Sequence, residues 1–249
     1  MGGGKLVIVP TPVGNLADMT PRAVEALKSA SLVLCEDTRT SGVLLRHFGI
    51  TTPTASHHKF NEHRSLEPVL NRIEGGETIA LVSDAGTPGI SDPGFMLSRE
   101  CRRRGLTVET LPGATAFVPA LVSSGLPCDR FFFEGFLPVK KGRTSRLAEL
   151  AALPVTFIIY ESPVRLARTL ANLADTCGAD RPAAVCREIS KLHETIHRGT
   201  LGELTEEFSR NQTRGEIVVI VGGSQPAQGP RRHRNKYRDD DNAAESDED

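Results

Sequence analysis

The chain has 249 residues, 39% of them hydrophobic, which is enough for one large domain or two small ones that fold without disulfide bonds. Its formal net charge is −1, and without the charged stretch 231–249 the chain carries 25 basic and 24 acidic residues, a charge of +1. This balance argues against a protein that grips nucleic acid by bulk charge, so any RNA contact must come from local basic clusters.

Cysteine spacing and apolar run lengths indicate the compartment. The five cysteines include no C-x-x-C pair, which argues against zinc sites and disulfide frameworks, so we expect reduced, mostly buried thiols and no bound metal. Neither a secretory hydrophobic region nor an 18-residue apolar run is present, so we expect a cytoplasmic protein with no membrane contact.

The first 125 residues alternate between apolar strand segments and helical segments. A strand at 5–10 is followed by a helix that Thr20 caps and Pro21 starts, running to about residue 30. Such alternation predicts a three-layer α/β domain over 1–125 with a parallel or largely parallel sheet, and its predicted boundary is the segment 124–127. The other expected strands are 31–35, a weak strand ending near His57, 79–82 and 106–111, and the other expected helices are 42–48, 62–73, 95–104 and a segment from after 116 to about 124.

The most distinctive segment is a loop that follows the central apolar strand. Its twelve residues, 83–94, contain three glycines and two prolines, so they continue neither a strand nor a helix. Open α/β sheets bind ligands at such carboxyl strand ends, where Asp84 and Asp92 add hydrogen-bond acceptors. The alternative is an ordinary strand-to-helix turn, although such connections usually have only ~2–6 residues. Two shorter rigid turns, 11–16 and 112–116, also follow strands.

The strand at 31–35 ends directly in the polar sequence Glu36-Asp37-Thr38-Arg39. This position is topologically equivalent to that of the glycine-rich loop, which favours a functional site. Two acidic residues are also favourable at the positive end of a helix dipole. A solvated helix start therefore explains the same residues equally well.

The second half also alternates and predicts another α/β domain over 126–224. The segment 225–249 contains proline, glycine and long charged runs and few apolar residues, so we expect a disordered charged tail that is dispensable for folding. The expected strands are 131–136, 155–160, 183–188 and 216–221, and the expected helices are 144–152, 164–176 and 201–210.

The segment 193–197, His-Glu-Thr-Ile-His, matches the zinc-protease pattern H-E-x-x-H, which requires a helix. Two β-branched residues within it and the nearby Gly199 are unfavourable to a helix. In a strand the two histidines would lie about 13 Å apart, too far to share one metal ion. We therefore do not expect a metalloprotease.

Seven short motifs follow one another along the chain: Pro-Thr-Pro-Val-Gly-Asn-Leu at 10–16, Glu-Asp-Thr-Arg at 36–39, Ser-Asp-Ala-Gly-Thr-Pro at 83–88 with Asp-Pro-Gly at 92–94, Pro-Gly-x-x-Ala at 112–116, Glu-Gly-Phe at 134–136, Tyr-Glu-Ser at 160–162 and Arg-Glu at 187–188. In this order they resemble a family of bacterial ribosomal RNA methyltransferases within the tetrapyrrole (precorrin/diphthine) methylase superfamily. The resemblance spans about residues 5–222, and each motif alone would be weak.

The resemblance implies two α/β domains with S-adenosylmethionine bound in the cleft between them, a homodimer, and no metal. It also implies 2′-O-methylation of the ribose of a cytidine in the decoding region of 16S ribosomal RNA, within the small ribosomal subunit. Members of the family usually carry a further small helical domain at the carboxyl end. This sequence departs from them there, since the chain after residue 224 has no helical hydrophobic pattern.

With this cofactor, the three rigid turns would surround the cleft with backbone N–H and C=O groups that suit an adenine edge and a methionine carboxylate. Asp84 would accept from ribose hydroxyls or the amino group, and Thr115, at a helix start, would donate to the carboxylate. A local cap or ion pair is the alternative for each residue. The expected cofactor contacts are Pro12, Asp84, Gly86, Thr87, Thr115, Ala116, Tyr160 and Arg187.

A ribose hydroxyl is a poor nucleophile, so the acceptor side needs groups that orient it and accept its proton. The candidates are Glu36, Asp37, Arg39 and Glu161, with Arg39 as a possible phosphate clamp. A second backbone grip is offered by basic residues that solvated surface charge explains as well: Lys140, Lys141, Arg143 and Arg146.

Two other functions fit the same fold. One is methylation of a small tetrapyrrole or of a protein side chain, and the other is a non-catalytic factor that binds the ribosome. Cofactor binding does not discriminate among them, whereas methyl transfer to small ribosomal subunits does.

Overall fold

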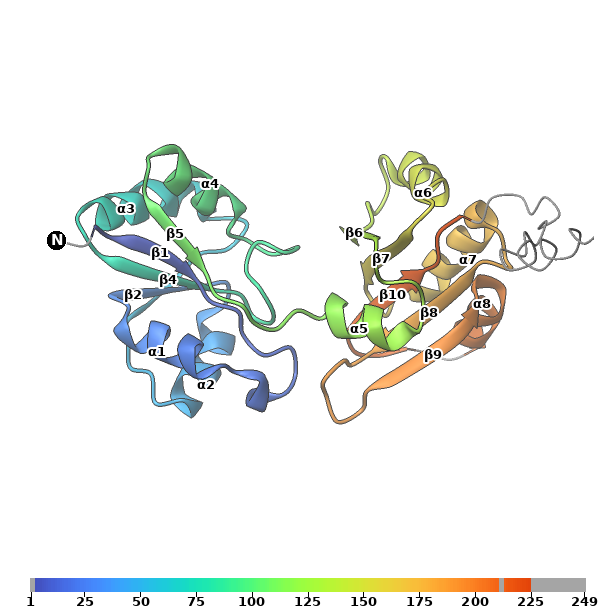
Figure 1. Cartoon of the computed structure of the whole chain (residues 1–249), viewed down its shortest axis with the longest axis horizontal. Coiled ribbons are helices and arrows are strands. Elements are labelled where there is room, and N and C mark those ends of the chain that lie inside the picture. The colour runs from blue at the N-terminus through green and yellow to red at the C-terminus, as the bar shows by residue number, and fades with distance from the viewer. Residues whose placement is uncertain (1–2, 211–212, 225–249) are drawn as a thin grey trace, which may run out of the picture.

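The computed structural model describes residues 3–210 and 213–224, which form two α/β units side by side along the long axis of the molecule (Figure 1). Each unit is built on one five-stranded sheet. The predicted fold class, two successive α/β units, is therefore confirmed. The charged tail expected at 225–249 lies outside the described residues.

The first sheet is parallel throughout, with the strand order β3-β2-β4-β1-β5. Ile79 in the central strand lies opposite Leu6 of β1 and Leu32 of β2. All three side chains are buried, as expected for a parallel sheet that helices cover on both faces. The strands are β1 (Lys5–Ile8), β2 (Leu32–Cys35), β3 (Thr54–Ser56), β4 (Thr78–Val82) and β5 (Thr107–Thr110).

Helices α1 and α2 cover one face of this sheet and α3 and α4 cover the other (Figure 1). Leu27 of α1 packs on the first face and Leu70 of α3 on the second. Thr20 accepts the backbone N–H of Ala23 and Pro21 is the first helical residue, which confirms the predicted start of α1. The helical segments are η1 (Leu16–Asp18), α1 (Pro21–Ser29), α2 (Thr38–His47), α3 (Glu62–Glu74) and α4 (Phe95–Arg103).

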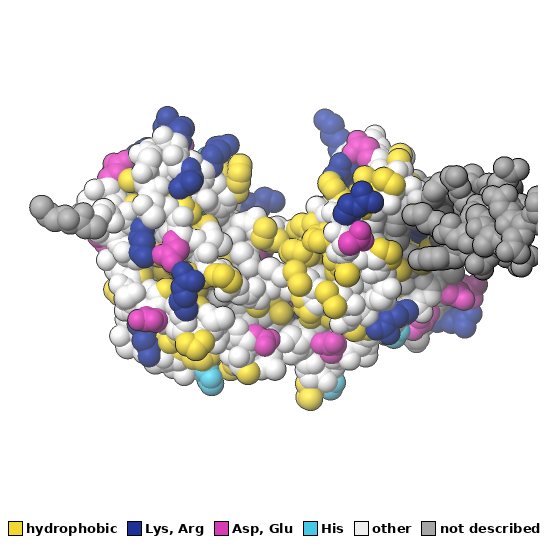
Figure 2. Space-filling model, viewed as in Figure 1, with side chains coloured by type: hydrophobic (Ala, Val, Ile, Leu, Met, Phe, Trp, Pro, Cys, Tyr) yellow, Lys and Arg dark blue, Asp and Glu magenta, His cyan; other side chains and the backbone are white. Residues whose placement is uncertain are grey.

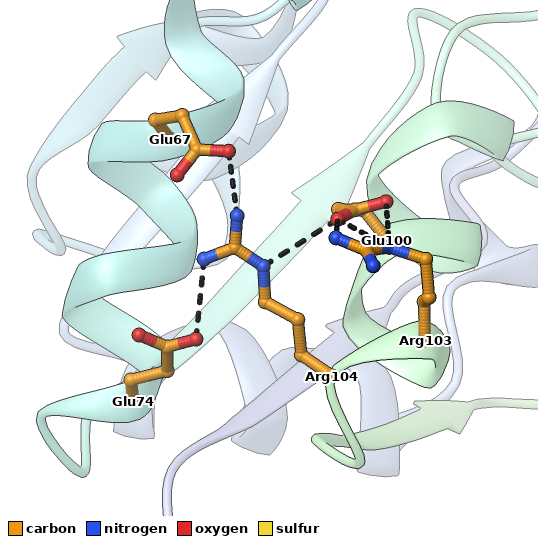
Figure 3. Close-up of polar contacts among 5 residues, drawn as sticks. All are labelled: Glu67, Glu74, Glu100, Arg103 and Arg104. Atoms are coloured by element: carbon orange, nitrogen blue, oxygen red, sulfur yellow. Dashed lines mark hydrogen bonds and ion pairs between the residues drawn. The ribbon is translucent and has the colours of Figure 1, made fainter.

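An ion-pair cluster joins α3 to α4 (Figure 3). Arg104, which directly follows α4, places Nη2 2.6 Å from Glu67 Oε1 and Nη1 3.2 Å from Glu74 Oε1. Glu100 pairs with both Arg103 and Arg104, and the carboxylates of Glu67 and Glu74 raise the pKa of Arg104 above its usual range. Partly exposed pairs contribute little stability singly, but the shared Arg104 fixes α4 against two positions of α3 that lie about two turns apart.

The second sheet is mixed, with the strand order β6-β7-β10-β8-β9. β6 pairs with β7 in parallel, and the remaining pairs are antiparallel. Helices α6, α7 and α8 pack on one face and α5 on the other. The strands are β6 (Phe131–Phe136), β7 (Thr156–Glu161), β8 (Pro182–Arg187), β9 (Thr195–Thr200) and β10 (Ile217–Val221), and the helices are α5 (Phe117–Ser124), α6 (Arg143–Ala151), α7 (Leu166–Cys177) and α8 (Leu201–Arg210).

The position of α5 differs from the expected domain boundary. Ala120 and Leu121 are buried against Ile158, Ala184 and Val218 of the second sheet, so α5 belongs to the second unit (Figure 1). The two units are therefore joined by the segment before α5 and not by the expected boundary after it. The Gly-Leu-Pro sequence that suggested that boundary ends a helix within the second unit.

The segment with the H-E-x-x-H pattern contains no helix. His193 lies in a turn, and His197 lies in β9, a strand that was not among those expected. His197 Nδ1 is 2.6 Å from Glu207 Oε1 of α8, which fixes the ring against that helix. No helix within the described ranges is long and apolar enough to cross a membrane.

Candidate functional site

Three turns at the carboxyl edge of the first sheet are bonded to one another. Thr11 and Gly86 exchange two backbone hydrogen bonds of 2.9 Å, which join the turn after β1 to the loop after β4. Thr87 Oγ1 donates to the carbonyl oxygen of Ala114 at 2.9 Å, which adds the turn after β5. The three turns therefore form one rigid wall.

This wall borders a cavity of about 410 Å³ between the two units. The first unit contributes Val13, Glu36 and the glycine-rich loop, and the second contributes 160–163 and 215–218. Figure 2 shows hydrophobic side chains gathered on the part of the second unit that faces the first. The volume falls within the roughly 300–1,000 Å³ of cavities that bind cofactors and other small ligands.

Aromatic and aliphatic side chains form the wall on the second unit. The rings of Phe136 and Phe133 lie 5.7 and 5.1 Å from that of Tyr160, both in edge-to-face geometry. Burial raises the pKa of Tyr160 to about 12, so its hydroxyl stays protonated and can donate. With Ile189 and Val218 beside them, these groups suit a flat apolar ring.

The polar lining of the cavity is acidic. Five of its residues carry carboxyl groups and none of the described lining residues is lysine or arginine: the acids are Glu36, Asp84, Asp92, Glu161 and Glu216. The pKa of Asp92 is raised to about 6, mainly by burial and secondly by the charge of Glu36. The pKa of Glu36 is also raised, mainly by burial and secondly by the charge of Asp84. Such a cavity favours a positively charged ligand, and in Asp92 it holds a carboxylate that accepts a proton near neutral pH.

Glu161 is fully used in holding the second unit together. Its side chain is 0% exposed, and its Oε1 accepts from Ser162 N at 2.7 Å and pairs with Arg165 Nη2 at 2.6 Å. Its Oε2 accepts from Thr169 Oγ1 at 2.6 Å, and Thr169 Oγ1 in turn accepts from buried Arg143 Nη2 at 2.8 Å. These contacts favour a positioning role for Glu161 over the acceptor-side role expected from the sequence.

We expect Glu161→Gln to lower the free energy of unfolding by about 3 kcal/mol, because it leaves two arginines without their buried counter-charge. Urea unfolding measures the loss. Glu206→Gln removes an exposed partner of Arg210 on α8 and should cost under about 0.5 kcal/mol. Equal losses in the two variants would contradict the buried network.

The residues at 36–39 occupy two different places, since Glu36 lies at the cavity and the others lie at the start of α2. Glu36 lines the cavity, whereas Asp37 is the N-cap of α2 and accepts the backbone N–H of Arg39 at 2.8 Å. The Arg39 guanidinium, 90% exposed, pairs with the same carboxylate and holds the pKa of Asp37 to about 2. Asp37 N donates to Asp84 Oδ1 at 3.2 Å, which ties this helix start to the glycine-rich loop.

Two loops with strained residues bring the units together at the cavity. Ser91 and Ser190 have φ values of +64° and +67°, which is uncommon outside glycine. Ser190 Oγ donates to Asp18 Oδ2 at 2.7 Å, across the two units. The second contact between the units is that of Ser91 with Gly135 of β6. A Cβ on Gly135 would lie 2.6 Å from Ser91 Oγ, so this contact requires glycine.

Six of the eight expected cofactor contacts line the cavity, and two do not. Pro12 is replaced in the lining by its neighbour Val13. Arg187 donates through Nε to the carbonyl of Arg214 at 3.0 Å and through Nη1 to Thr195 Oγ1, so it supports the entry to β10. The six that line the cavity are Asp84, Gly86, Thr87, Thr115, Ala116 and Tyr160.

Two of the basic residues expected to grip RNA serve the structure instead. Arg143 is buried and donates to Thr169 and to the carbonyl of Pro138. Arg146 pairs with Glu134 and with Glu149. Lys140 and Lys141 remain exposed.

Sequence reasoning missed the lining from β10 and from the turn before it. Gly215 and Glu216 precede the strand Ile217–Val221, so this is another glycine-containing strand end, although here it is the start of an antiparallel strand. Phe136 was also missed. The signal for it was an aromatic residue at the carboxyl end of β6, directly after Gly135. In the described part of the chain no group of three or more histidine, cysteine, aspartate or glutamate residues is arranged to hold a metal ion.

Comparison with known proteins gives concordant results. The family model described as Tetrapyrrole (Corrin/Porphyrin) Methylases matches residues 5–205. A Synechocystis protein named ribosomal RNA small subunit methyltransferase I is 47% identical over 95% of this chain and 85% of its own length. Its Pseudomonas aeruginosa namesake is 48% identical over 92% and 82%. A Thermus thermophilus uroporphyrin-III C-methyltransferase, solved with S-adenosyl homocysteine, covers 88% of this chain and 97% of its own, with a TM-score of 0.60 and 19% identity.

Proposed function

Because the chain belongs to the tetrapyrrole (corrin/porphyrin) methylase family, we propose that it is an S-adenosylmethionine-dependent methyltransferase of small-subunit ribosomal RNA. The observation that carries the proposal is the identity of 47–48%, over more than nine-tenths of this chain, to proteins named for that activity. The acidic cavity between the two units supplies the matching site.

The described residues fit this cofactor. Carboxylates without a neighbouring lysine or arginine in the lining suit a sulfonium and an ammonium group, and the aromatic and aliphatic wall suits an adenine ring. Thr115 and Ala116, directly before the first turn of α5, place a hydroxyl and the positive end of a helix where they can meet a carboxylate. When bound, S-adenosylmethionine supplies an electrophilic methyl group on its sulfonium centre.

The acceptor we propose is the ribose 2′-hydroxyl of a cytidine in the decoding region of 16S ribosomal RNA. The chain must orient this hydroxyl and take its proton as the new C–O bond forms. Asp92 and Glu36 are the groups suited to that task, because both line the cavity and both have pKa values raised toward neutrality. Asp37 instead caps the start of α2, and Arg39 pairs with its carboxylate.

The substrate form we propose is an assembled or partly assembled small subunit, in the cytoplasm. The described units carry almost no net charge, so they have little grip on free RNA, and a structured particle supplies shape for recognition. Lys140 and Lys141 lie on the turn before α6 and offer one backbone contact.

The direct test is transfer of labelled methyl groups to purified small subunits that lack the modification, followed by mass mapping of the RNA. Incorporation at one cytidine ribose is expected. Transfer only to a tetrapyrrole or a protein would replace the proposed substrate, and subunit binding without any transfer would indicate a non-catalytic factor.

We also propose a homodimer, for which α5 offers a surface. Val118 and Val122 lie one turn apart and are exposed, and exposed Phe131 packs near Phe117 of the same helix. Sedimentation velocity should show a dimer that Val122→Glu dissociates. A monomeric wild-type chain would refute this part of the proposal.

A further inference from the structure

The loop after β3 lies beside the acceptor side of the cavity. In the sheet, Ser56 is opposite Cys35, and His57 N donates to the carbonyl of Cys35 at 2.7 Å. The chain leaving β3 therefore starts next to Glu36, which leaves β2 at the same edge. His58 lies close enough to Glu36 to oppose slightly the rise in the Glu36 pKa that burial and Asp84 cause. An RNA strand whose ribose reaches Glu36 must therefore pass near this loop.

The loop is rigid and exposes one aromatic side chain. His58 N donates to Asn61 Oδ1 at 2.7 Å, and Asn61 Nδ2 donates to the carbonyl of Ser56 at 3.1 Å. Phe60 N donates to His58 Nδ1 at 3.2 Å, and the two rings meet edge to face at 6.1 Å. Phe60 is nevertheless 91% exposed. Its ring face is held out to solvent on a preformed turn.

Basic residues outnumber acidic ones around this ring, since Glu62 is the one acidic residue of the segment 58–64. Lys59, His63 and Arg64 are exposed, and none of them has an ion-pair partner within residues 3–210 and 213–224. A protein interface of ordinary size needs an apolar core, which one phenylalanine among charged residues does not supply. An exposed ring beside unpaired cations instead matches the way proteins stack an unpaired base and hold its backbone.

We propose that the 58–64 segment is a docking platform for single-stranded RNA, in which Phe60 stacks on a nucleobase close to the methylated nucleotide and Lys59 contacts the adjacent phosphate. This inference rests on the proposed function, because it identifies where the RNA substrate of that reaction is held. It assigns RNA contact to a segment that lies outside the cavity.

Phe60→Ala tests the platform, since removal of a side chain that is 91% exposed leaves the core unchanged. Single-turnover transfer to unmethylated subunits is measured against enzyme concentration, with direct subunit binding in parallel. We expect the half-saturating concentration to rise about tenfold in Phe60→Ala and to return to near the wild-type value in Phe60→Trp. Cofactor affinity, measured by calorimetry, should be unchanged in both.

Two further variants define the contact. Lys59→Gln should weaken binding and reduce the slope of log affinity against log salt by about 0.7–1, whereas Phe60→Ala should leave that slope unchanged. Leu192→Ala is the matched control, because Leu192 is 92% exposed on the second unit, and it should bind subunits as wild type does.

The outcomes separate this inference from the proposed function. If the wild-type chain transfers methyl groups and Phe60→Ala changes the half-saturating concentration by less than twofold, the docking platform is overturned and the proposed function stands. Loss of the dimer in Phe60→Ala, seen by sedimentation, would reassign the ring to self-association and also overturn it. If the wild-type protein binds subunits without transfer, the proposed reaction is refuted, and the platform is still tested by comparing the subunit binding of Phe60→Ala with that of the wild type. A wild-type protein that neither binds nor transfers would overturn the proposed function and the platform together.

Discussion

Gly86→Val is expected to weaken S-adenosylmethionine binding by about 100-fold, or ~2.8 kcal/mol. Gly86 has a φ of +82°, a region that β-branched residues strongly disfavour. Relief of this strain requires the loop to move, and both backbone groups of Gly86 are bonded to Thr11, so the wall of the cavity moves with it. The added side chain would also extend from a residue that lines the cavity. Isothermal calorimetry measures the loss.

The matched control is Gly105→Val. Gly105 has a φ of +73°, and a Cβ on it would meet nothing within 4 Å. It follows α4 and lies outside the cavity lining, so this variant carries the same kind of backbone strain without touching the site. We expect both variants to lose stability in urea and only Gly86→Val to lose cofactor. Unchanged calorimetric affinity in Gly86→Val would remove the glycine-rich loop from the proposed binding site.

Local signals in the sequence were sufficient for most of the first unit. Thr20 and Pro21 define the start of α1, and the unbroken apolar run of β4 indicated a strand buried on both faces. The glycine-rich loop was recognisable because no regular element accommodates three glycines and two prolines in twelve residues. Its position at the cavity followed from the rule that parallel sheets bind ligands at their carboxyl strand ends.

Tertiary packing decided what the sequence could not. The apolar face of α5 contains nothing to show which sheet it covers, and only its contact with Ile158 and Val218 places it in the second unit. β9 was missed because its polar sequence is half-exposed and stabilised by pairing with β8. Arg187 resembled a ligand-binding residue at a strand end, yet its guanidinium bonds the carbonyl of Arg214, which is 27 residues further along the chain.

The acceptor residues illustrate the same limit. From the sequence, Glu36 and Asp37 are equivalent candidates for the acceptor side. The turn into α2 places their side chains in different surroundings, so they have different roles. Asp37 closes the first turn of the helix, while Glu36 lies in the cavity with Asp84 and Asp92. Asp92 is 56 residues from Glu36, so only the fold reveals that these two carboxyl groups influence each other.

This pair leads to the prediction for the chemical step. Asp92→Asn should lower the single-turnover rate at pH 7 by about 100-fold, and Glu36→Gln by at least about tenfold, because each removes a proton acceptor from the cavity. Cofactor affinity should stay within about threefold in both, because four of the five acidic residues that line the cavity remain in each variant. Asp37→Ala is the neighbouring control, and since Asp37 does not line the cavity its rate should also stay within about threefold.

The pH dependence gives the sharper test. A carboxyl group accepts a proton only when ionised, so the wild-type rate should rise with pH through the pKa of Asp92, about 6. The charge of Glu36 helps to raise that pKa, and Glu36→Gln removes the charge. The rising limb should therefore move to lower pH in Glu36→Gln, while the plateau falls because the remaining carboxylate is a weaker base. Two results together would contradict this mechanism: an unshifted rising limb in Glu36→Gln and near-wild-type rates in Asp92→Asn. The two carboxyl groups would then contribute only negative charge to the cavity, and another group would accept the proton.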